Sequence, residues 1–213
     1  MSFKDRIGNN LLLLYTIKKT NEIGLIDDTL KLQKIVFHSQ RRLSAKKLKA
    51  FSYNFFRWEK GPFSADLNND LTLLIHAGLI KPGWPIELTD EGYKLLESCI
   101  EIFDSNKRLI KNIDEVVEEK AKQDPNLIKE ETYDLTVTLP RTHKRMTIRE
   151  IPKGTPILFR ISDAKAERIF DLNEQWLSTL EVAFHQEIGE SLVKSCEDAS
   201  EGKAHDFRTI PAS

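Results

Sequence analysis

An aromatic segment followed by a Gly-Pro turn constrains this chain more than any other feature. The run Phe51-Ser52-Tyr53-Asn54-Phe55-Phe56-Arg57-Trp58 alternates aromatic with polar side chains over most of its length, and Gly61-Pro62 follows it closely. Such alternation predicts a strand with one buried face, and the Gly-Pro pair predicts a change of direction. The same aromatic residues, with basic neighbours, could also stack on nucleic-acid bases, but the alternation favours a core-facing strand.

Helical patterns lie on both sides of this segment. Asn9 to Lys18 has apolar residues at helical spacing, with Gly8 and Asn9 placed to start the turn, and from Thr29 a second pattern runs to Arg41-Arg42. After the turn, Ser64 is expected to cap a helix that stops at Gly78, and Thr89 to cap the next one. A further amphipathic helix is expected over about 105–122, ended by Pro125.

A short hairpin is expected between two of these helices. Leu79-Ile80 and Ile86-Glu87-Leu88 are apolar runs on either side of Lys81-Pro82-Gly83-Trp84-Pro85. The order helix, helix, strand, helix, hairpin, helix predicts a winged-helix-like domain over residues 1–125.

The second part of the chain changes its period. Leu135, Val137 and Leu139 alternate before Pro140, and two or three short strands or extended segments are expected within 126–162. From 163 to 213 we expect an amphipathic helix followed by a polar tail. The sequence as a whole therefore predicts an α+β fold that is mainly α, with a winged-helix-like N-terminal domain, a small β hairpin and an α/β C-terminal region ending in that amphipathic helix.

The composition is that of a chain with no dominant charge. Its 213 residues include 32 Lys plus Arg and 33 Asp plus Glu, for a formal net charge of −1. Binding to nucleic acid or to an anionic membrane would therefore need a local patch. The longest apolar run is far below the roughly 20 residues of a membrane span, and no cleavable signal pattern follows Lys4 and Arg6. We expect a cytoplasmic protein with no membrane partner, in which Cys99 and Cys196 are buried thiols.

No motif in the sequence supports catalysis. The five histidines are scattered without metal-ligand spacing, and there is no phosphate-binding glycine loop and no nucleophile motif. The sequence therefore predicts a protein that is not an enzyme and that has no cofactor and no metal site.

Positive charge concentrates in two places. The first lies between Arg41 and Lys60, with Glu59 as its one acid, and it is a candidate patch for nucleic acid or for an acidic partner: Arg41, Arg42, Lys46, Lys47, Lys49, Arg57 and Lys60. The second lies in the later extended region: Arg141, His143, Lys144, Arg145, Arg149 and Lys153. Either cluster could equally be a solvated surface.

The expected recognition helix disfavours DNA. The stretch from Ser64 to Thr72 has two aspartates and no Lys or Arg, so it would bring negative charge against phosphates. An exposed Trp84 in the turn of the wing would suit a protein contact better.

An apolar stripe near the C-terminus is the candidate site for a protein partner. Its members recur at helical spacing: Trp176, Leu177, Leu180, Phe184, Ile188, Leu192 and Cys196. The stripe could insert into a groove of the partner, pack on its own domain, or close a symmetric interface between two copies of the chain. The sequence does not decide the oligomeric state.

Three runs of sequence occur in order along the first half to two-thirds of the chain. They are Leu32-Gln33-Lys34-Ile35-Val36-Phe37, then Phe55-Phe56-Arg57-Trp58-Glu59-Lys60-Gly61-Pro62-Phe63-Ser64, then Leu71 to Ile80. Together they resemble the SocA-like antitoxin domain, also called the Panacea domain. A second similarity lies in the tail, where 192–207 looks like the toxin-wrapping tails of small antitoxins.

The resemblance implies a bacterial, archaeal or phage protein encoded beside a toxin. Such proteins neutralise the cognate toxin by direct binding or act as proteolytic adaptors for it. We therefore expect an antitoxin-like protein of a type II toxin-antitoxin system whose C-terminal stripe binds the toxin. The alternatives are a winged-helix transcriptional regulator that binds DNA and a proteolytic adaptor.

Overall fold

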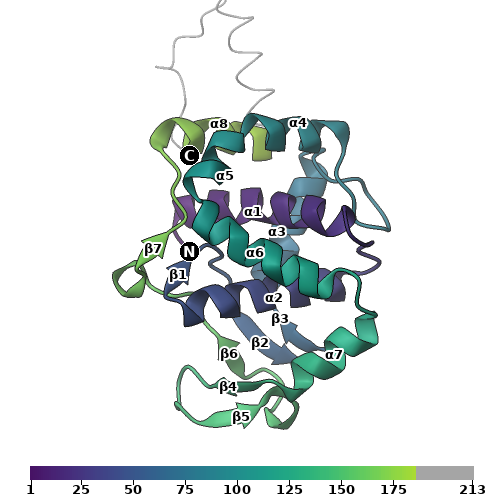
Figure 1. The fold of residues 1–213 in the computed structure, drawn as a ribbon, viewed down its shortest axis with the longest axis vertical. Helices are drawn as coiled ribbons and strands as arrows, with labels where there is room; N and C mark the ends of the chain where they lie inside the picture. Colours follow the sequence, from purple (N-terminus) through teal and green to yellow (C-terminus); the bar gives the residue numbers. More distant parts are fainter. Residues whose placement is uncertain (186–213) are drawn as a thin grey trace, which may run out of the picture.

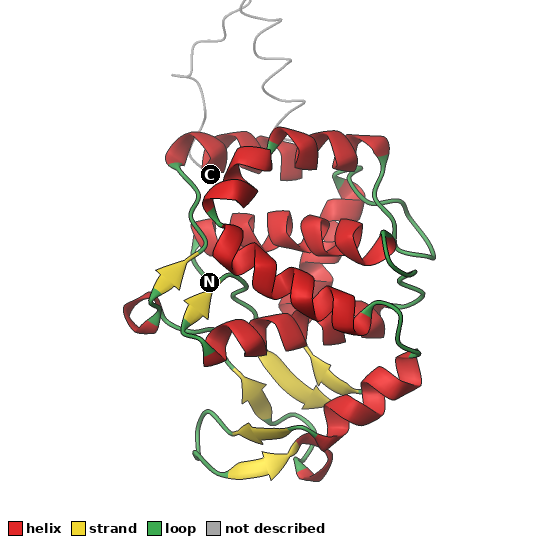
Figure 2. Ribbon diagram, in the orientation of Figure 1, coloured by secondary structure: helices red, strands yellow, loops and turns green. Residues whose placement is uncertain are grey.

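The computed structural model describes residues 1–185. Its architecture is mainly helical, with two small sheets at one end of the helices and a third beside them (Figures 1 and 2). The α-helices are α1 (Phe3–Asn21), α2 (Thr29–Ala45), α3 (Ala65–His76), α4 (Asp90–Ser98), α5 (Ile100–Ser105), α6 (Lys107–Lys120), α7 (Pro125–Asp134) and α8 (Glu174–Phe184). The expected α+β class, mainly α, is confirmed.

The strands form three small sheets. They are β1 (Leu48–Lys49), β2 (Phe55–Trp58), β3 (Gly61–Phe63), β4 (Thr136–Thr138), β5 (Arg145–Thr147), β6 (Pro156–Leu158) and β7 (Arg168–Ile169). The central sheet has the antiparallel order β3-β2-β6, β4 pairs with β5 as a hairpin, and β1 pairs in parallel with β7. The strands expected within 126–162 are therefore present as β4, β5 and β6.

Helix α1 begins earlier than the sequence predicted. Ser2, rather than the Gly8-Asn9 pair, is the N-cap, because its hydroxyl accepts a hydrogen bond from the Asp5 amide and the Asp5 carboxylate accepts one from the Ser2 amide. Gly8 lies inside the helix, where a Cβ would meet the Phe170 side chain at 3.5 Å. Gly8 therefore does not start the helix, and a Cβ at this position would make only an ordinary van der Waals contact with the C-terminal segment.

Helix α2 is the central helix, and it begins where the sequence predicted. Asp28 is its N-cap, one residue before Thr29, and accepts from the Lys31 amide at 2.7 Å. The α2 helix packs against α6, α7 and the β2–β3 hairpin.

The aromatic segment has one face in the core, as predicted, but Phe56 and Trp58 are exposed. Phe51, Tyr53 and Phe55 are buried, and Phe37 of α2 lies edge-on to Phe55 at 5.3 Å between ring centroids. Only the end of the segment is a strand, because in the earlier part the backbone groups of Tyr53 bond to the Gln40 side chain instead of to a neighbouring strand. Burial of the aromatic residues removes base stacking by this face.

Two expectations about local structure are corrected. The hairpin expected between Leu79 and Leu88 has a single bridge, Ile80 with Leu88, and no regular strand, because the prolines at 82 and 85 limit the ladder. Pro125 does not only end a helix; it is the first residue of α7, capped by Asp124, since a proline at this position lacks only an amide hydrogen that would have no helical partner.

The C-terminal segment returns across the first half of the chain. Its strand β7 pairs with β1, and the Asn106 side chain bonds to both the amide and the carbonyl of Asp171. Helix α8 packs on α1. One hydrophobic cluster runs from Ile7 to Phe184, so the described parts of 1–125, 126–162 and 163–213 share a core.

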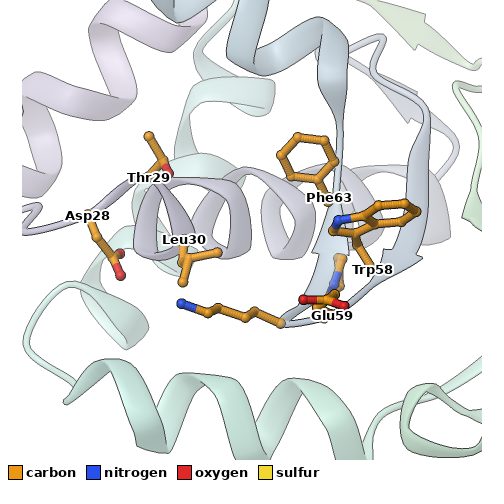
Figure 3. A pocket seen from close by; sticks show the side chains of 9 residues that line it. Asp28, Thr29, Leu30, Trp58, Glu59 and Phe63 are labelled. Atoms are coloured by element: carbon orange, nitrogen blue, oxygen red, sulfur yellow. The ribbon is translucent and has the colours of Figure 1, made fainter. Parts of the chain in front are cut away.

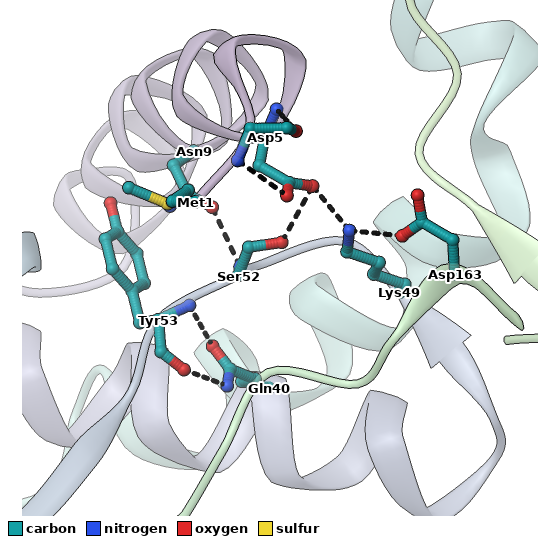
Figure 4. A network of polar contacts seen from close by, with 9 residues as sticks. Met1, Asp5, Asn9, Gln40, Lys49, Ser52, Tyr53 and Asp163 are labelled. Atoms are coloured by element: carbon teal, nitrogen blue, oxygen red, sulfur yellow. Dashed lines mark hydrogen bonds and ion pairs between the residues drawn. The ribbon is translucent and has the colours of Figure 1, made fainter. Parts of the chain in front are cut away.

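An ion-pair network holds the C-terminal segment against α1 and β1. Lys49, with 4% of its side chain exposed, lies 2.5 Å from Asp5 at the start of α1 and 2.5 Å from Asp163 in the C-terminal segment (Figure 4). Burial alone would lower the pKa of Lys49, but hydrogen bonds from its ammonium to Asp163 and Asp5 outweigh burial and raise it. The Lys49 ammonium thereby links three segments that are distant in sequence.

Within residues 1–185, no helix has the length and apolar character needed to cross a membrane. Cys99 is a free, buried thiol, as expected, and Cys196 lies outside the described residues.

Candidate functional site: a groove beside the aromatic hairpin

A groove opens between the beginning of α2 and the turn that joins β2 to β3 (Figure 3). Its volume is about 400 Å³, within the range of small-ligand pockets. The residues around it come from two short stretches: Asp28, Thr29 and Leu30 on α2, and Trp58, Glu59, Lys60, Gly61, Pro62 and Phe63 on the hairpin.

The hairpin exposes one aromatic residue at the rim of the groove. Strand β2 alternates, so that Phe55 points into the core whereas Trp58, at the end of the strand, is 52% exposed. Gly61 has φ +102°, a conformation that favours glycine and allows the tight turn directly after Trp58.

Helix α7 holds the turn in place. The Tyr133 hydroxyl donates to the Glu59 carbonyl at 2.7 Å, and the Arg57 guanidinium lies over the Tyr133 ring at 4.9 Å. The Glu59 carboxylate pairs with Lys153 at 2.8 Å, which lowers the pKa of Glu59. The groove is thus built on supported backbone, which keeps Trp58 in a defined position.

Both acids at the groove are already engaged. Asp28 caps α2, and Glu59 pairs with Lys153. By contrast, Lys60 is exposed and forms no ion pair with any acid in residues 1–185.

A second lysine, Lys34, is buried behind the groove and does not line it; its Cε lies 3.9 Å from the Cβ position of Gly61. Lys34 is 3% exposed, and its ammonium bonds to the Leu30 carbonyl at 3.5 Å. Within the described chain no carboxylate lies within ion-pair distance of it. Burial, reinforced by the positive charges of Lys129 and Lys60 and opposed by Asp28, lowers the pKa of Lys34 to about 8.

The first basic cluster does not form an open cationic surface. Arg42 pairs with Glu115 and Glu119, at 3.0 and 2.6 Å, and Lys47 pairs with Glu167 at 3.2 Å. Acids that are distant in sequence therefore neutralise much of this candidate patch.

The remaining members of the cluster are spread over different surroundings. Lys46 donates to the Asn112 side chain, Lys49 is buried, and Arg57 donates to the Ile148 carbonyl. Arg41 lines a separate hollow with Thr136–Thr138, and Lys60 belongs to the groove. Arg41, Arg42 and Lys46 nevertheless line one hollow together with Glu119, so the structure keeps these three close and separates the others.

The second basic cluster keeps more of its charge exposed. Arg141, Lys144 and Arg145 are exposed on or next to the loop of the β4–β5 hairpin, in which no acid occurs between Thr136 and Thr147. Arg149 and Lys153, by contrast, pair with acids of α7 and of the β2–β3 turn.

The C-terminal stripe is corrected for its described members. Leu180 and Phe184 are 0% exposed, and Trp176 and Leu177 are partly buried against the same core. These side chains pack on α8's own domain because α1 offers an apolar face that the sequence pattern of α8 cannot reveal. Ile188 and Leu192 lie outside the described residues.

Sequence reasoning missed the groove itself. It assigned Trp58 to a buried strand face and Lys34 to a motif of unstated role, while the exposed Trp84 was placed correctly, at 60% exposure. The available signal was that Phe55 and Phe56 are adjacent, since two neighbouring strand residues cannot both face the core.

No protein-family model, no curated protein and no solved structure significantly matches this chain. The fold and the groove define a mainly helical α+β protein with a supported, partly apolar groove.

Proposed function

We propose that this chain is an antitoxin-like protein that neutralises a cognate toxin by direct protein–protein binding, and that the groove beside the β2–β3 turn is the contact site. The observation that carries the proposal is Trp58, held half-exposed at the rim of a hollow by contacts that fix its turn. The hairpin side of the groove, from Trp58 to Phe63, also lies within one of the runs on which the resemblance to SocA-like antitoxins depends.

The physical argument concerns how binding energy is distributed over a protein interface. A few central residues, most often Trp, Tyr and Arg, supply most of it, and preorganised side chains lose less entropy on binding. Trp58 meets both conditions, with the partly exposed Phe63 and Leu30 next to it. The core-packed stripe of α8 meets neither.

The prediction of a winged-helix-like domain is part of this proposal. Helices α3 and α4 flank the single-bridge turn expected as a wing, and α3 has Asp66 in its first turn. Asp70 of the same helix is buried and accepts from the Tyr53 hydroxyl at 2.9 Å, so it supports the core. Helix α3 has no lysine or arginine, and its one basic residue is His76 at the C-terminal end. A helix with these charges favours binding to a protein over binding in the major groove of DNA.

The test is growth rescue. Each gene that neighbours this one is expressed in a heterologous bacterium, and any that stops growth is co-expressed with the full chain. We expect the wild type and Trp84→Ala to restore growth, and Trp58→Ala to fail while retaining the wild-type melting temperature. Trp84 is the matched control because it is a tryptophan of similar exposure outside the groove. Rescue by Trp58→Ala would contradict the groove, and absence of any rescued toxin would contradict the function.

One observation favours a second candidate function, a transcriptional regulator that binds DNA. The β4–β5 hairpin resembles a wing in shape and has three exposed cations, Arg141, Lys144 and Arg145. Basic hairpins of this kind grip phosphates, with an affinity that falls as salt rises.

This candidate is tested by charge reversal. Arg141→Glu with Lys144→Glu and Arg145→Glu should abolish salt-sensitive binding to duplex DNA from the gene's own promoter. The control is Lys107→Glu with Arg108→Glu and Lys111→Glu, an equal change of charge on α6. Equal loss in both variants, or no binding by the wild type, removes this function.

A further inference from the structure

We propose that the second half of α2 forms a binding site for a small phosphate monoester, separate from the groove at the beginning of the same helix. The site consists of two neighbouring hollows that have Arg41 in common. One hollow is cationic and lies between α2 and α6, and the other is mainly apolar and lies between α2, β4 and β6.

The cationic hollow has a volume of about 380 Å³. It is lined by His38, Arg41, Arg42, Ala45 and Lys46 of α2 and its C-cap, and by Val116 and Glu119 of α6. Its lining thus contains three permanent positive charges and a single carboxylate. This excess of cations distinguishes it from the groove, whose lining has two carboxylates and one lysine.

One cation of this hollow already has acidic partners. The Arg42 guanidinium lies 2.6 Å from the Glu119 carboxylate and 3.0 Å from that of Glu115, so its charge is matched within the fold. The same contacts occupy Glu119, which is therefore engaged by Arg42 and not by the other two cations.

The other two cations have no acid beside them. Arg41 forms no ion pair and no side-chain hydrogen bond with any of residues 1–185, although a guanidinium has five N–H donors. The Lys46 ammonium donates to the neutral side chain of Asn112, and within the described chain no carboxylate lies at ion-pair distance from it. Two positive charges at one hollow are thus left for an anion from outside.

The second hollow adds apolar surface next to Arg41. It has a volume of about 230 Å³ and is lined by Phe37 and Arg41 of α2, by Thr136, Val137 and Thr138 of β4, and by Ile157 and Leu158 of β6. Its lining contains no acid, and Arg41 is its one charged residue. A ligand whose anionic group lies in the first hollow would therefore place an attached apolar group in the second.

The number of unmatched cations favours phosphate over carboxylate. A carboxylate has one negative charge, whereas a phosphate monoester has a charge of about −1.5 to −2 at pH 7 and three strong acceptor oxygens. A guanidinium binds phosphate through two parallel hydrogen bonds, and an ammonium binds it as a point charge. One phosphate would thus satisfy both Arg41 and Lys46.

The apolar hollow favours a small monoester over duplex DNA. The paired and stacked bases of a duplex would leave Phe37, Ile157 and Leu158 uncovered, because they cannot leave the helix without losing their pairing. A single ring or a short aliphatic group has the size that such a hollow accepts.

The experiment is isothermal titration calorimetry of the full chain with three probes: phenyl phosphate, inorganic phosphate and benzoate. At about 150 mM salt, we expect phenyl phosphate to bind about tenfold more tightly than either of the others. Inorganic phosphate lacks the apolar group, and benzoate lacks the second negative charge. Equal affinity for phenyl phosphate and benzoate, or no binding of phenyl phosphate, would overturn the inference.

Two variants separate the hollows. Arg41→Met should weaken phenyl phosphate about tenfold without changing the melting temperature, since Arg41 has no partner among the described residues to lose. Thr138→Trp should fill the apolar hollow, so that phenyl phosphate binds no more tightly than inorganic phosphate, whose affinity stays unchanged. Arg141→Met is the matched control, because Arg141 is an exposed arginine that lines neither hollow.

The remaining outcomes also decide the inference. An equal loss of affinity in Arg41→Met and Arg141→Met would show general attraction to positive charge, and displacement of phenyl phosphate by a short DNA duplex would assign the cations to nucleic acid. Much tighter binding of a phosphotyrosine peptide than of phenyl phosphate would place the phosphate on a protein partner. Each of these results overturns the small-molecule site, and none of them depends on the growth rescue.

Discussion

Lys34 and Lys49 are two buried lysines in opposite situations. Lys49 is 4% exposed and contacts Asp5 and Asp163, and Lys34 is 3% exposed and contacts no acid in the described chain. The pKa of Lys49 lies above its ordinary value and that of Lys34 falls to about 8. Equal burial therefore produces opposite electrostatic states, because the surroundings differ in carboxylates.

The difference separates a buried charge that stabilises the fold from one that costs it free energy. Around Lys49, each charge is matched within the molecule, and the network joins α1, β1 and the C-terminal segment (Figure 4). Around Lys34, the only partner of the ammonium in the described residues is the Leu30 carbonyl, and no carboxylate matches its charge. A buried ion pair with good geometry offsets the loss of hydration, whereas a buried ammonium without an acid does not recover it.

The largest expected effect distinguishes a buried apolar residue of α8 from an exposed one at the groove. Leu180→Ala should lower the free energy of unfolding by about 3 kcal/mol, because it leaves a cavity in the core between α8 and α1. Trp58→Ala should change it by less than about 0.5 kcal/mol, since Trp58 is 52% exposed. Urea unfolding monitored by circular dichroism measures both. An unchanged free energy of unfolding in Leu180→Ala would show that Leu180 is not part of the core, and α8 would again be a candidate docking surface.

A smaller loss is expected when the paired lysine is removed. Lys49→Met leaves Asp5 without its main partner and should lower the free energy of unfolding by about 2 kcal/mol at pH 7; the loss is limited because Asp163 is solvated. Since the pKa of Lys49 is raised in the folded state, its contribution is present below about pH 10.5, the unfolded value, and disappears as the pH rises through the higher folded value. Chemical unfolding at pH 7 and at alkaline pH checks both statements, and an unchanged stability at pH 7 would contradict them.

The smallest effect has the opposite sign. Lys34→Met should raise the free energy of unfolding by about 1 kcal/mol at pH 7, because it removes a buried cation that has no partner. The folded pKa of about 8 lies below the unfolded 10.5, so the wild type gains stability as the pH rises from about 8 to 10.5, and the advantage of the variant shrinks across that window. Unfolding curves recorded from pH 7 to 10.5 measure this convergence. A destabilised variant would show that Lys34 has a partner in the fold.

Much of the local structure was predictable, for reasons that particular residues make clear. Ser64 and Thr89 cap the helices expected of them, and Gly78 follows α3 with φ +70°. Caps and left-handed glycines depend on a few neighbouring residues, so their signals are complete within a short window. Pro125 shows the limit, because the same residue can end one helix or begin the next.

The candidate site was less predictable. The basic residues at Arg42 and Lys47 look like a patch in the sequence, but Glu119 and Glu167, far along the chain, neutralise them. The stripe of α8 looks like a docking face, but α1 covers its described part. In both cases, the deciding partner is remote in sequence.

The sequence by itself determined most of the helices, the caps at Ser64 and Thr89, the buried side of the aromatic segment and the mainly helical class, because these depend on periodicity and short-range bonding. Only the tertiary structure decided which of two similar lysines has an acid beside it, which tryptophan borders a groove and which apolar helix is covered. These properties depend on residues brought together from distant parts of the chain, as Asp5, Lys49 and Asp163 are, and no local pattern specifies such meetings.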